Sequence, residues 1–411
     1  MNKKQINFID LFAGAGGMSE GFIQAGFNSI AHVEMNKHAC DTLKTRVAFQ
    51  FLKQKNKINI YEQYLKNKIT KEELWSEIPS YEINSVINSE ISKKTISEIF
   101  NKIDNKIKNS KIDLIIGGPP CQAYSIVGRA RDSEGMVNDP RNHLYLYYIK
   151  FLEKYKPKMF VFENVPGILS AKNGEFFSKI KKAFKKAGYE LEFNILNSKD
   201  FNVLQNRKRV ILIGWKKNIS FKYPTIEPLK LNFNIKNDLF FDLPKLAPGE
   251  GRDFIEYSEN PNKYLNESGI RKYFDFVTQH KSRPLNENDK KIYKIAIKKM
   301  VKEGKRINYK DLPDDLKKHK NDSIFNNRFQ VVDPFSISHT IVAHISCDGN
   351  YYIYPDLDQI RSISIREAAR IQSFPDDYFF EGGQTAAFKQ IGNAVPPLMA
   401  KGLAEIIKKY L

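Results

Sequence analysis

Over roughly the first 215 residues, short apolar runs alternate with longer segments in which apolar residues recur at helical spacing. The runs predict buried strands, and the longer segments predict helices between them. Strands are expected at residues 6–12, 28–34, 111–116, 158–163, 189–197 and 209–215, and helices at 18–26, 143–155 and 176–187. This alternation predicts a doubly wound α/β domain.

Two regions interrupt the alternation. Residues 44–111 are rich in Lys and Asn with helical periodicity, and they predict an inserted helical segment. From residue 219 to about 360, prolines, scattered aromatic residues and short strand-like pieces predict a second, smaller domain of mostly irregular and β structure. Two more helices are expected after it, at 364–373 and at about 395–410.

Composition narrows the class of protein. The chain has 411 residues, of which 41% are hydrophobic and 27% charged, which is too apolar for a disordered protein and enough for a sizeable core. No apolar run approaches the ~20 residues of a membrane-spanning helix. The glycines near the N-terminus come too early for a signal peptide. These features predict a soluble, cytoplasmic protein with no membrane contact.

The charge suggests a class of partner, and the positions of the cysteines bear on disulfides and metal binding. A net charge of +19, from 66 basic and 47 acidic residues, suggests a polyanionic partner, although an AT-rich genome would also enrich Lys. Cys40, Cys121 and Cys347 lie far apart and form no CxxC pair. Neither a disulfide framework nor a metal site is therefore expected.

A glycine cluster, Asp10–Gly17, lies between the first strand and the first helix. Glycine lets the backbone turn sharply and approach a ligand, and the helix start offers free N–H groups to an anionic group. Glu34 ends the next strand, where nucleotide-binding folds place a carboxylate for ribose hydroxyls. The cluster is neither GxGxxG nor a phosphate loop. It predicts an adenosine-containing cofactor, and a purely structural turn is the alternative.

A second turn, Gly117–Gln122, follows the third expected strand and contains two prolines before Cys121. The prolines fix the backbone, so the thiol is presented in one orientation at the sheet edge where ligands bind. Helix N–H groups beside a cysteine favour its thiolate, which suits a nucleophile. A buried structural cysteine would not need this lead-in.

Six ordered segments resemble the motifs of the C5-cytosine DNA methyltransferases, and together they span nearly the whole chain. They are DLFAGAGGMSEGF (Asp10–Phe22), GGPPCQAYS (Gly117–Ser125), ENV (163–165), the Gln-x-Arg-x-Arg element (205–209), REAARIQSFP (Arg366–Pro375) and GNAVPP (Gly392–Pro397). The resemblance implies a Rossmann-like domain that uses S-adenosyl-L-methionine, with S-adenosyl-L-homocysteine as product. It also implies double-stranded DNA as partner, with the target cytosine flipped out of the duplex.

The resemblance also implies the division of the chain and of the chemistry. The expected parts are a catalytic domain at 1–218 completed by 385–411, a target-recognition domain at 219–362 and a hinge region at 363–384. Cys121 would add to C6 of cytosine, which makes C5 nucleophilic toward the methyl group. Glu163 would protonate or hydrogen-bond N3. Arg209, with Arg207 beside it, would stabilise charge near O2.

Cofactor contacts are carried over by motif position to Phe12, Ala15, Gly17, Glu34, Met35, Glu90, Ile91, Pro120, Leu144, Asn393 and Val395. Glu90 departs from the family pattern, which usually has Asp near the adenine. A helix start without a ligand role is the alternative for Glu90 and Ile91.

DNA contacts are expected from two regions. Residues 123–142 form a loop after the nucleophile that could close on DNA as a lid, and sequence readout should lie within 219–345. The candidate residues are Gln122, Ser125, Arg129, Arg131, Gln205 and Thr340. For the basic stretch 290–306, a DNA contact and a solvated helix face are the two alternatives.

Three rival functions remain at this point. A tRNA cytosine-5 methyltransferase shares the chemistry, a catalytically silent DNA-binding paralogue shares the fold, and a nicotinamide dehydrogenase shares the first glycine loop. The family analogy favours a monomeric, nucleoid-associated modification enzyme of a prokaryotic restriction–modification system, with a cognate endonuclease acting separately.

Overall fold

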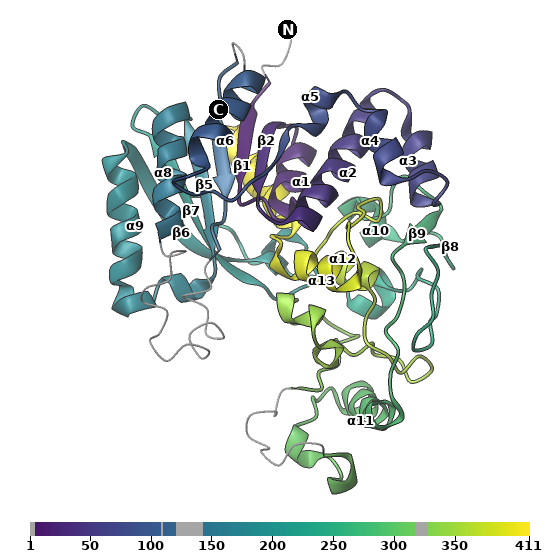
Figure 1. The fold of residues 1–411 in the computed structure, drawn as a ribbon. Coiled ribbons are helices and arrows are strands. Elements are labelled where there is room, and N and C mark those ends of the chain that lie inside the picture. The colour runs from purple at the N-terminus through teal and green to yellow at the C-terminus, as the bar shows by residue number, and fades with distance from the viewer. Residues whose placement is uncertain (1–4, 108–109, 121–142, 318–327) are drawn as a thin grey trace.

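The computed structural model describes residues 5–107, 110–120, 143–317 and 328–411. A seven-stranded sheet of order β3-β2-β1-β4-β5-β7-β6 lies at its centre (Figure 1). Its strands are β1 (Asn7–Leu11), β2 (Asn28–Glu34), β3 (Val86–Asn88), β4 (Leu114–Gly117), β5 (Met159–Asn164), β6 (Tyr189–Asn197) and β7 (Lys208–Lys216). The expected doubly wound α/β architecture is confirmed, and all six expected strands are present.

Strand direction determines which residues meet at one edge. β1 to β5 are parallel, so Leu11 pairs with both Val33 and Gly117 near the carboxyl ends of their strands. β7 is antiparallel to both of its neighbours. It therefore begins at the edge where β5 ends, and Val210 pairs with Asn164. Ligands of open α/β sheets bind at this edge.

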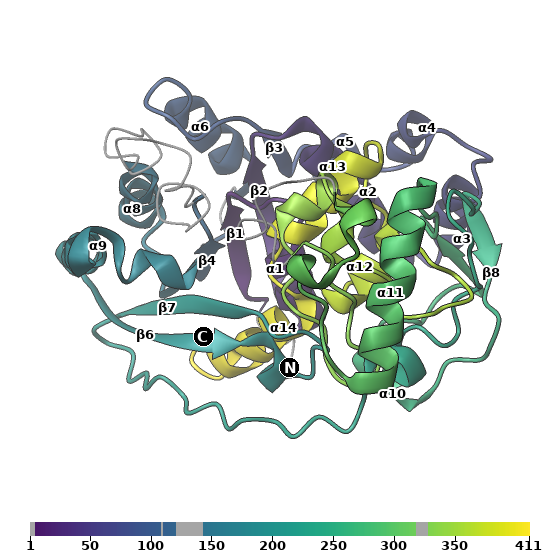
Figure 2. The same cartoon turned by 90° about the horizontal axis from the view of Figure 1, so that it is seen from below.

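Helices cover both faces of the sheet. On one face, α1 (Gly17–Gln24) and α14 (Pro397–Lys408) pack against β1, β4, β5 and β7. On the other face lie α6 (Ile96–Ile107), α8 (Leu144–Tyr155) and α9 (Glu175–Lys186). Figure 2 shows α8 and α9 on the opposite side of β6 and β7 from α14. The C-terminal helix thus packs on the same face of the sheet as the first helix.

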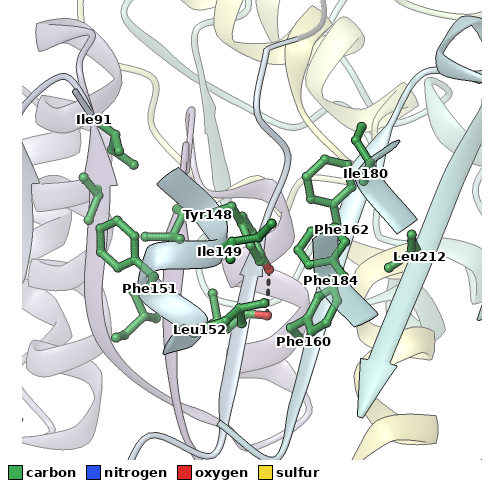
Figure 3. Packing of buried hydrophobic residues seen from close by; sticks show 14 of the residues in the cluster. Ile91, Tyr148, Ile149, Phe151, Leu152, Phe160, Phe162, Ile180, Phe184 and Leu212 are labelled. Carbon is green, nitrogen blue, oxygen red and sulfur yellow. Dashed lines mark hydrogen bonds between the residues drawn. The ribbon is translucent and has the colours of Figure 1, made fainter. Parts of the chain in front are cut away.

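Tyr148 is at the centre of the α8 face (Figure 3). Its ring contacts Phe160, Phe162 and Phe184, with centroids 5.5–5.9 Å apart. Its hydroxyl lies 3.0 Å from the carbonyl oxygen of Ile115 and 2.9 Å from that of Val161. A buried tyrosine needs such a partner, because an unpaired hydroxyl loses its hydrogen bonds to water.

The segment expected as one helical insertion has a more complex structure. Helices α2 (Lys37–Gln54), α3 (Ile58–Leu65), α4 (Lys71–Ser76) and α5 (Ser80–Ile83) form its first part. The strand β3 and helix α6 follow within residues 44–111, and both belong to the central α/β unit. The expectation of a purely helical insertion is therefore wrong, because a three-residue strand carries too little periodicity to be seen in sequence.

Residues 219–362 are mostly irregular, with short 3₁₀ turns. Their described part contains a two-stranded sheet, β8 (Phe254–Glu256) and β9 (Phe276–Thr278), a π-helical turn at Ile235–Leu239, and the α-helices α10 (Lys263–Ser268) and α11 (Glu287–Glu303). α11 accounts for most of the basic stretch 290–306, and its buried face forms a small core of its own with residues 307–316, Phe329, Val331 and Ile353.

Residues 363–384, expected as a hinge, are densely packed. α12 (Ile365–Ile371) and α13 (Gln384–Asn393) share one apolar cluster with residues 235–277 and 332–352. Arg370 on α12 is fully buried and donates to the carboxylates of Asp242 and Asp376, at shortest distances of 2.6 Å. Among the described residues, no helix is both long and apolar enough to cross a membrane.

Candidate active site

The loop between β1 and α1 is closely constrained. Phe12 and Gly16 both have positive φ, of 56° and 76°, so the backbone bends sharply before the helix starts. A Cβ at Gly17 would lie 2.3 Å from the carbonyl oxygen of Val395, so only glycine allows the two segments to approach so closely. Ala15 is buried, and its carbonyl accepts a 2.5 Å hydrogen bond from the Tyr378 hydroxyl. The loop is therefore held from both sides.

Glu34 ends β2 beside this loop. Its carboxylate accepts hydrogen bonds from the backbone N–H of Gly14, at 2.9 Å, and of Asn36, at 2.7 Å. Met35 next to it is 63% exposed, which is unusual for a large apolar side chain and leaves a hydrophobic surface open at the sheet edge. Asn88, at the end of β3, donates to the carbonyl oxygens of both Glu34 and Met35, at 3.2 and 3.0 Å.

Glu90 and Ile91 follow β3 at the same edge. Glu90 is exposed, and its carbonyl accepts hydrogen bonds from the hydroxyls of Ser89 and Thr95. Ile91 is 4% exposed and packs in the cluster under α6 and α8. Both residues follow β3, which pairs with β2, the strand that ends at Glu34. Their cofactor role stays a prediction.

Beneath the loop, Asp10 forms a buried polar chain with Ser19 and His32. The Ser19 hydroxyl donates to Asp10 and lies 3.1 Å from Nδ1 of His32. Burial raises the pKa of Asp10 to about 7, opposed by the hydrogen bond from Ser19 and reinforced by the charge of Glu34. Burial also lowers the pKa of His32 to about 4.

The raised pKa of Asp10 predicts a pH-dependent stability. The folded state binds this proton more tightly than the unfolded state, so its stabilising effect is complete at low pH and is lost as the pH rises through about 7. We expect Asp10→Asn to remove roughly 2 kcal/mol of the loss in unfolding free energy between pH 5 and pH 8. Denaturant melts at several pH values measure it, with exposed Asp275→Asn as the control. Identical pH slopes for Asp10→Asn and wild type would contradict it.

The turn after β4 is tied to β5. A Cβ on Gly118 would lie 2.5 Å from a carboxylate oxygen of Glu163, so the backbone of the turn passes directly against that side chain. The amide of Asn164 donates to the carbonyl oxygen of Pro119 at 3.3 Å. Pro120 is exposed at the end of the described part of the turn.

Glu163 and Arg209 form an ion pair at this edge. Arg209 Nε lies 2.9 Å from Glu163 Oε1. The Arg209 side chain is 12% exposed and the Glu163 side chain is 15% exposed. Burial raises the pKa of Glu163, and the charges of Arg209 and then Arg207 oppose the rise. Burial lowers the pKa of Arg209, with Glu163 opposing. A carboxyl with a raised pKa can donate a proton, and the guanidinium beside it can stabilise a developing negative charge.

Two residues expected to act at the site are instead enclosed. Arg207 is fully buried and donates to the carbonyl oxygens of Ile341, at 2.5 Å, and Gly392, at 3.0 Å. Gln205 is also fully buried and bonds Ile341, Ile371 and Gln372. In this structure Gln205 has no surface to offer to DNA, because its amide is used to join distant segments. Spacing within the motif could not reveal these partners.

Thr340 is half-buried, and its hydroxyl donates to the carbonyl oxygen of Asn206 at 2.5 Å. Asn393 is exposed at the end of α13, whereas Val395 is buried under α1. Leu144 is half-buried at the start of α8. Cys121, Gln122, Ser125, Arg129 and Arg131 lie outside the described residues.

Sequence reasoning missed two residues of this edge, Tyr378 and Asn164. Tyr378 reaches Ala15 across 363 residues of chain, so no local pattern indicates the contact. Asn164 lies within the Glu-Asn-Val element, and its polar side chain at the end of an apolar strand was the available signal. Among the described residues, no group of three or more His, Cys, Asp or Glu side chains gathers as a metal site.

The sequence profile of the C-5 cytosine-specific DNA methylases matches residues 6–74 and 52–409. The type II methyltransferase M.Bpa9945I of Bacillus paralicheniformis is 41% identical, with 98% of each chain covered. The type II methyltransferase M.DdeI of Desulfomicrobium norvegicum is 32% identical over 98% of this chain and 89% of that protein.

Two solved structures share the fold. A prophage-encoded protein of E. coli, assigned as a DNA modification methyltransferase, has a TM-score of 0.62 at 22% identity, with 99% of both chains covered. The methyltransferase EhMeth of Entamoeba histolytica has a TM-score of 0.55 at 16% identity, with the same coverage. The profile match and the full-length relatives place the chain in one family. It belongs to the C-5 cytosine-specific DNA methylases, enzymes whose substrate is DNA.

Proposed function

We propose that this enzyme transfers a methyl group from S-adenosyl-L-methionine to C5 of a cytosine flipped out of duplex DNA, through a covalent adduct between Cys121 and C6. The observation that carries the proposal is the Glu163–Arg209 pair, 2.9 Å apart, against the turn that leads into Cys121. The pair supplies an acid and a fixed cation at one sheet edge, and the sequence puts the proposed nucleophile directly after the described part of the turn.

The pair suits the charge that such an adduct develops. When a thiolate adds to C6 of cytosine, electron density moves toward N3 and O2 of the ring. Burial raises the pKa of Glu163, which favours the protonated carboxyl that could donate to N3. Arg209 retains its positive charge and can donate to O2. The electron density then returns through C5, which forms a bond to the carbon of the transferred methyl group.

The neighbouring turn supports the role of Cys121. Asn164 holds the carbonyl of Pro119, and Gly118 lets the backbone lie against Glu163. Two consecutive prolines fix φ at the two positions before Cys121, which supports a defined presentation of its thiol. We propose that the Cys121 thiolate attacks C6 and is expelled when the C5 proton is removed.

The residues around the β1–α1 loop fit S-adenosyl-L-methionine. Gly14 has open space above it, Glu34 presents a carboxylate for ribose hydroxyls, and exposed Met35 offers an apolar surface to adenine. Asn393 is exposed at the end of α13. When bound, the cofactor supplies an electrophilic methyl group on a sulfonium and leaves as S-adenosyl-L-homocysteine. Phe12, Ala15, Gly17, Pro120, Leu144 and Val395 would complete the pocket, with Glu90 and Ile91 on the adenine side.

We further propose that residues 219–362 read the target sequence and that Thr340 lies at the DNA-facing end of this region. The type II relatives favour a modification enzyme of a restriction–modification system. We propose that it acts as a monomer and that a separate endonuclease is its partner in that system. Phosphate contacts by basic side chains should make DNA binding strongly salt-dependent.

Base-resolution methylation sequencing tests the proposal. The chain is expressed in a host that lacks its own cytosine methylation, and purified enzyme is assayed on duplex DNA and on tRNA with labelled cofactor. We expect 5-methylcytosine at one position of a recurring short sequence, and no label in tRNA. Methylation of tRNA alone, or of N4 or N6 positions in DNA, would contradict the proposal.

A further inference from the structure

Residues 204–207 pair with residues 338–341, which lie at the end of the proposed recognition region. The backbone N–H of Ser338 donates to Leu204 at 3.0 Å, and that of Asn206 donates to Ser338 at 2.9 Å. The N–H of Ile341 donates to the side-chain oxygen of Gln205 at 2.8 Å. We call these two paired segments the interlobe seam. It joins the recognition region directly to the chain that enters β7.

Arg207 adds a third segment to the seam. Its Nη1 donates to Ile341 in the recognition region, and its Nη2 donates to Gly392 at the end of α13. The guanidinium is fully buried, so it can touch neither DNA nor a flipped base in this arrangement. Within the described residues its guanidinium donates to the carbonyls of Ile341 and Gly392, and its Nε has no hydrogen-bond partner.

Each segment held by Arg207 leads to a functional group. Arg209, two residues further along β7, forms the ion pair with Glu163. Asn393, directly after Gly392, is the exposed residue proposed to contact the cofactor. Ile341 follows Thr340, which marks the end of the recognition region. A shift of any one segment at the seam therefore moves one of these groups relative to the others.

A guanidinium is suited to this position by its geometry. Its donors lie in one rigid plane, so they reach two carbonyl groups from different segments at fixed angles, which a lysine ammonium cannot reproduce. Burial lowers the pKa of Arg207, and the neighbouring charge of Arg209 lowers it further. A buried cation without a bonded carboxylate is unfavourable for stability, and an apolar side chain would avoid that penalty.

We propose that Arg207 is a positioning residue that aligns the Glu163–Arg209 pair and the cofactor segment with the recognition region through the interlobe seam. The inference rests on the proposed function of the site and assigns to Arg207 a role without substrate contact. It differs from the expectation that Arg207 acts beside Arg209 on the base. The seam thereby couples binding of the correct sequence to the alignment of the catalytic groups.

Full-length Arg207→Met and Arg207→Lys test the proposal. Methionine fills similar space without donors, and lysine retains the charge with one mobile donor group. We expect Arg207→Met to lower the single-turnover rate constant at least 30-fold, while the KM for DNA changes less than threefold, because Arg207 contacts protein and not DNA. Arg207→Lys should recover part of the rate. It should also restore the pH profile, which in Arg207→Met moves to higher pH because a charge that lowers the pKa of Glu163 is lost.

Leu152→Ala is the matched control for lost stability. Leu152 belongs to α8 and is fully buried in the cluster drawn in Figure 3, so its truncation is expected to destabilise the fold. Rates are compared at a temperature at which all variants are folded. Leu152→Ala should keep the wild-type rate constant and pH profile.

Amide hydrogen exchange tests the pairing at the interlobe seam independently of the methylation rate. In Arg207→Met, the amides of Asn206 and Ile341 should lose protection relative to Leu152→Ala. A wild-type rate and pH profile in folded Arg207→Met would overturn the proposal, as would unchanged protection of these amides. If the wild-type chain transfers no methyl group to DNA, the proposed function fails first, and the positioning role fails with it even if the amides lose protection.

Discussion

Glu163→Gln is expected to lower the rate constant of methyl transfer by about 10²–10⁴ while the affinities for DNA and cofactor stay within a few fold. Gln preserves the size of the side chain and a polar contact with Arg209, but it has no proton to transfer to N3. The loss therefore falls on the step in which negative charge develops on the ring. Single-turnover methylation of a duplex containing the target sequence measures it, and exposed Glu190→Gln on β6 is the control.

The pH dependence of the methyl-transfer rate provides a second test of this prediction. Burial raises the pKa of Glu163, so the protonated form persists to higher pH than for an exposed glutamate. If the protonated carboxyl is the acid, the wild-type rate should be constant below this pKa and fall as the pH rises through it. Glu163→Gln should lack that limb. A variant that keeps more than a third of the rate, with the same limb, would exclude Glu163 as the acid.

Cys121→Ser is expected to reduce methyl transfer by more than about 10³-fold. A serine hydroxyl is far less ionised than a thiol near neutral pH and is a poorer nucleophile toward C6. Without the adduct, C5 stays too electron-poor to attack a methyl sulfonium. DNA and cofactor binding should persist, because neither depends on the sulfur. The same assay of Cys347→Ser, which changes an exposed cysteine, controls for general effects of thiol loss.

Catalysis by Cys121→Ser at more than a tenth of the wild-type rate would show that the sulfur is not the nucleophile. Loss of activity in Cys347→Ser as well would point to a general sensitivity to thiol replacement. Binding of a labelled duplex by each variant is measured in parallel, so that a rate is compared only between enzymes that hold DNA equally well.

Most of the central sheet could be predicted from sequence because its strands are continuous apolar runs. β2 and β6 have the expected bounds, and β1, β4, β5 and β7 differ from them by a few residues at most. β3 could not be found, since Val86–Asn88 is too short to set a period. α13 was missed for a different reason. It begins after Gly383 without a side-chain cap and contains Gly392 in its last turn.

The strand order and the direction of β7 follow from long-range pairing, which local periodicity does not encode. That pairing decides the site, because it places Arg209 beside Glu163. The motifs identified both residues, together with Glu34. They could not show that Gln205 and Arg207 are buried, because the partners of Arg207 lie 134 and 185 residues away in the chain.

Covalent trapping tests the central chemistry most directly. A duplex with 5-fluorocytosine at the target position is incubated with enzyme and S-adenosyl-L-methionine, and the product is separated under denaturing conditions. The carbon–fluorine bond blocks release of the thiolate, so the wild-type chain should remain bound to DNA, with the link mapped to Cys121 by peptide mass spectrometry. The account would be contradicted by a wild-type enzyme that methylates normal duplex yet leaves no such complex, or by a link that maps to another residue.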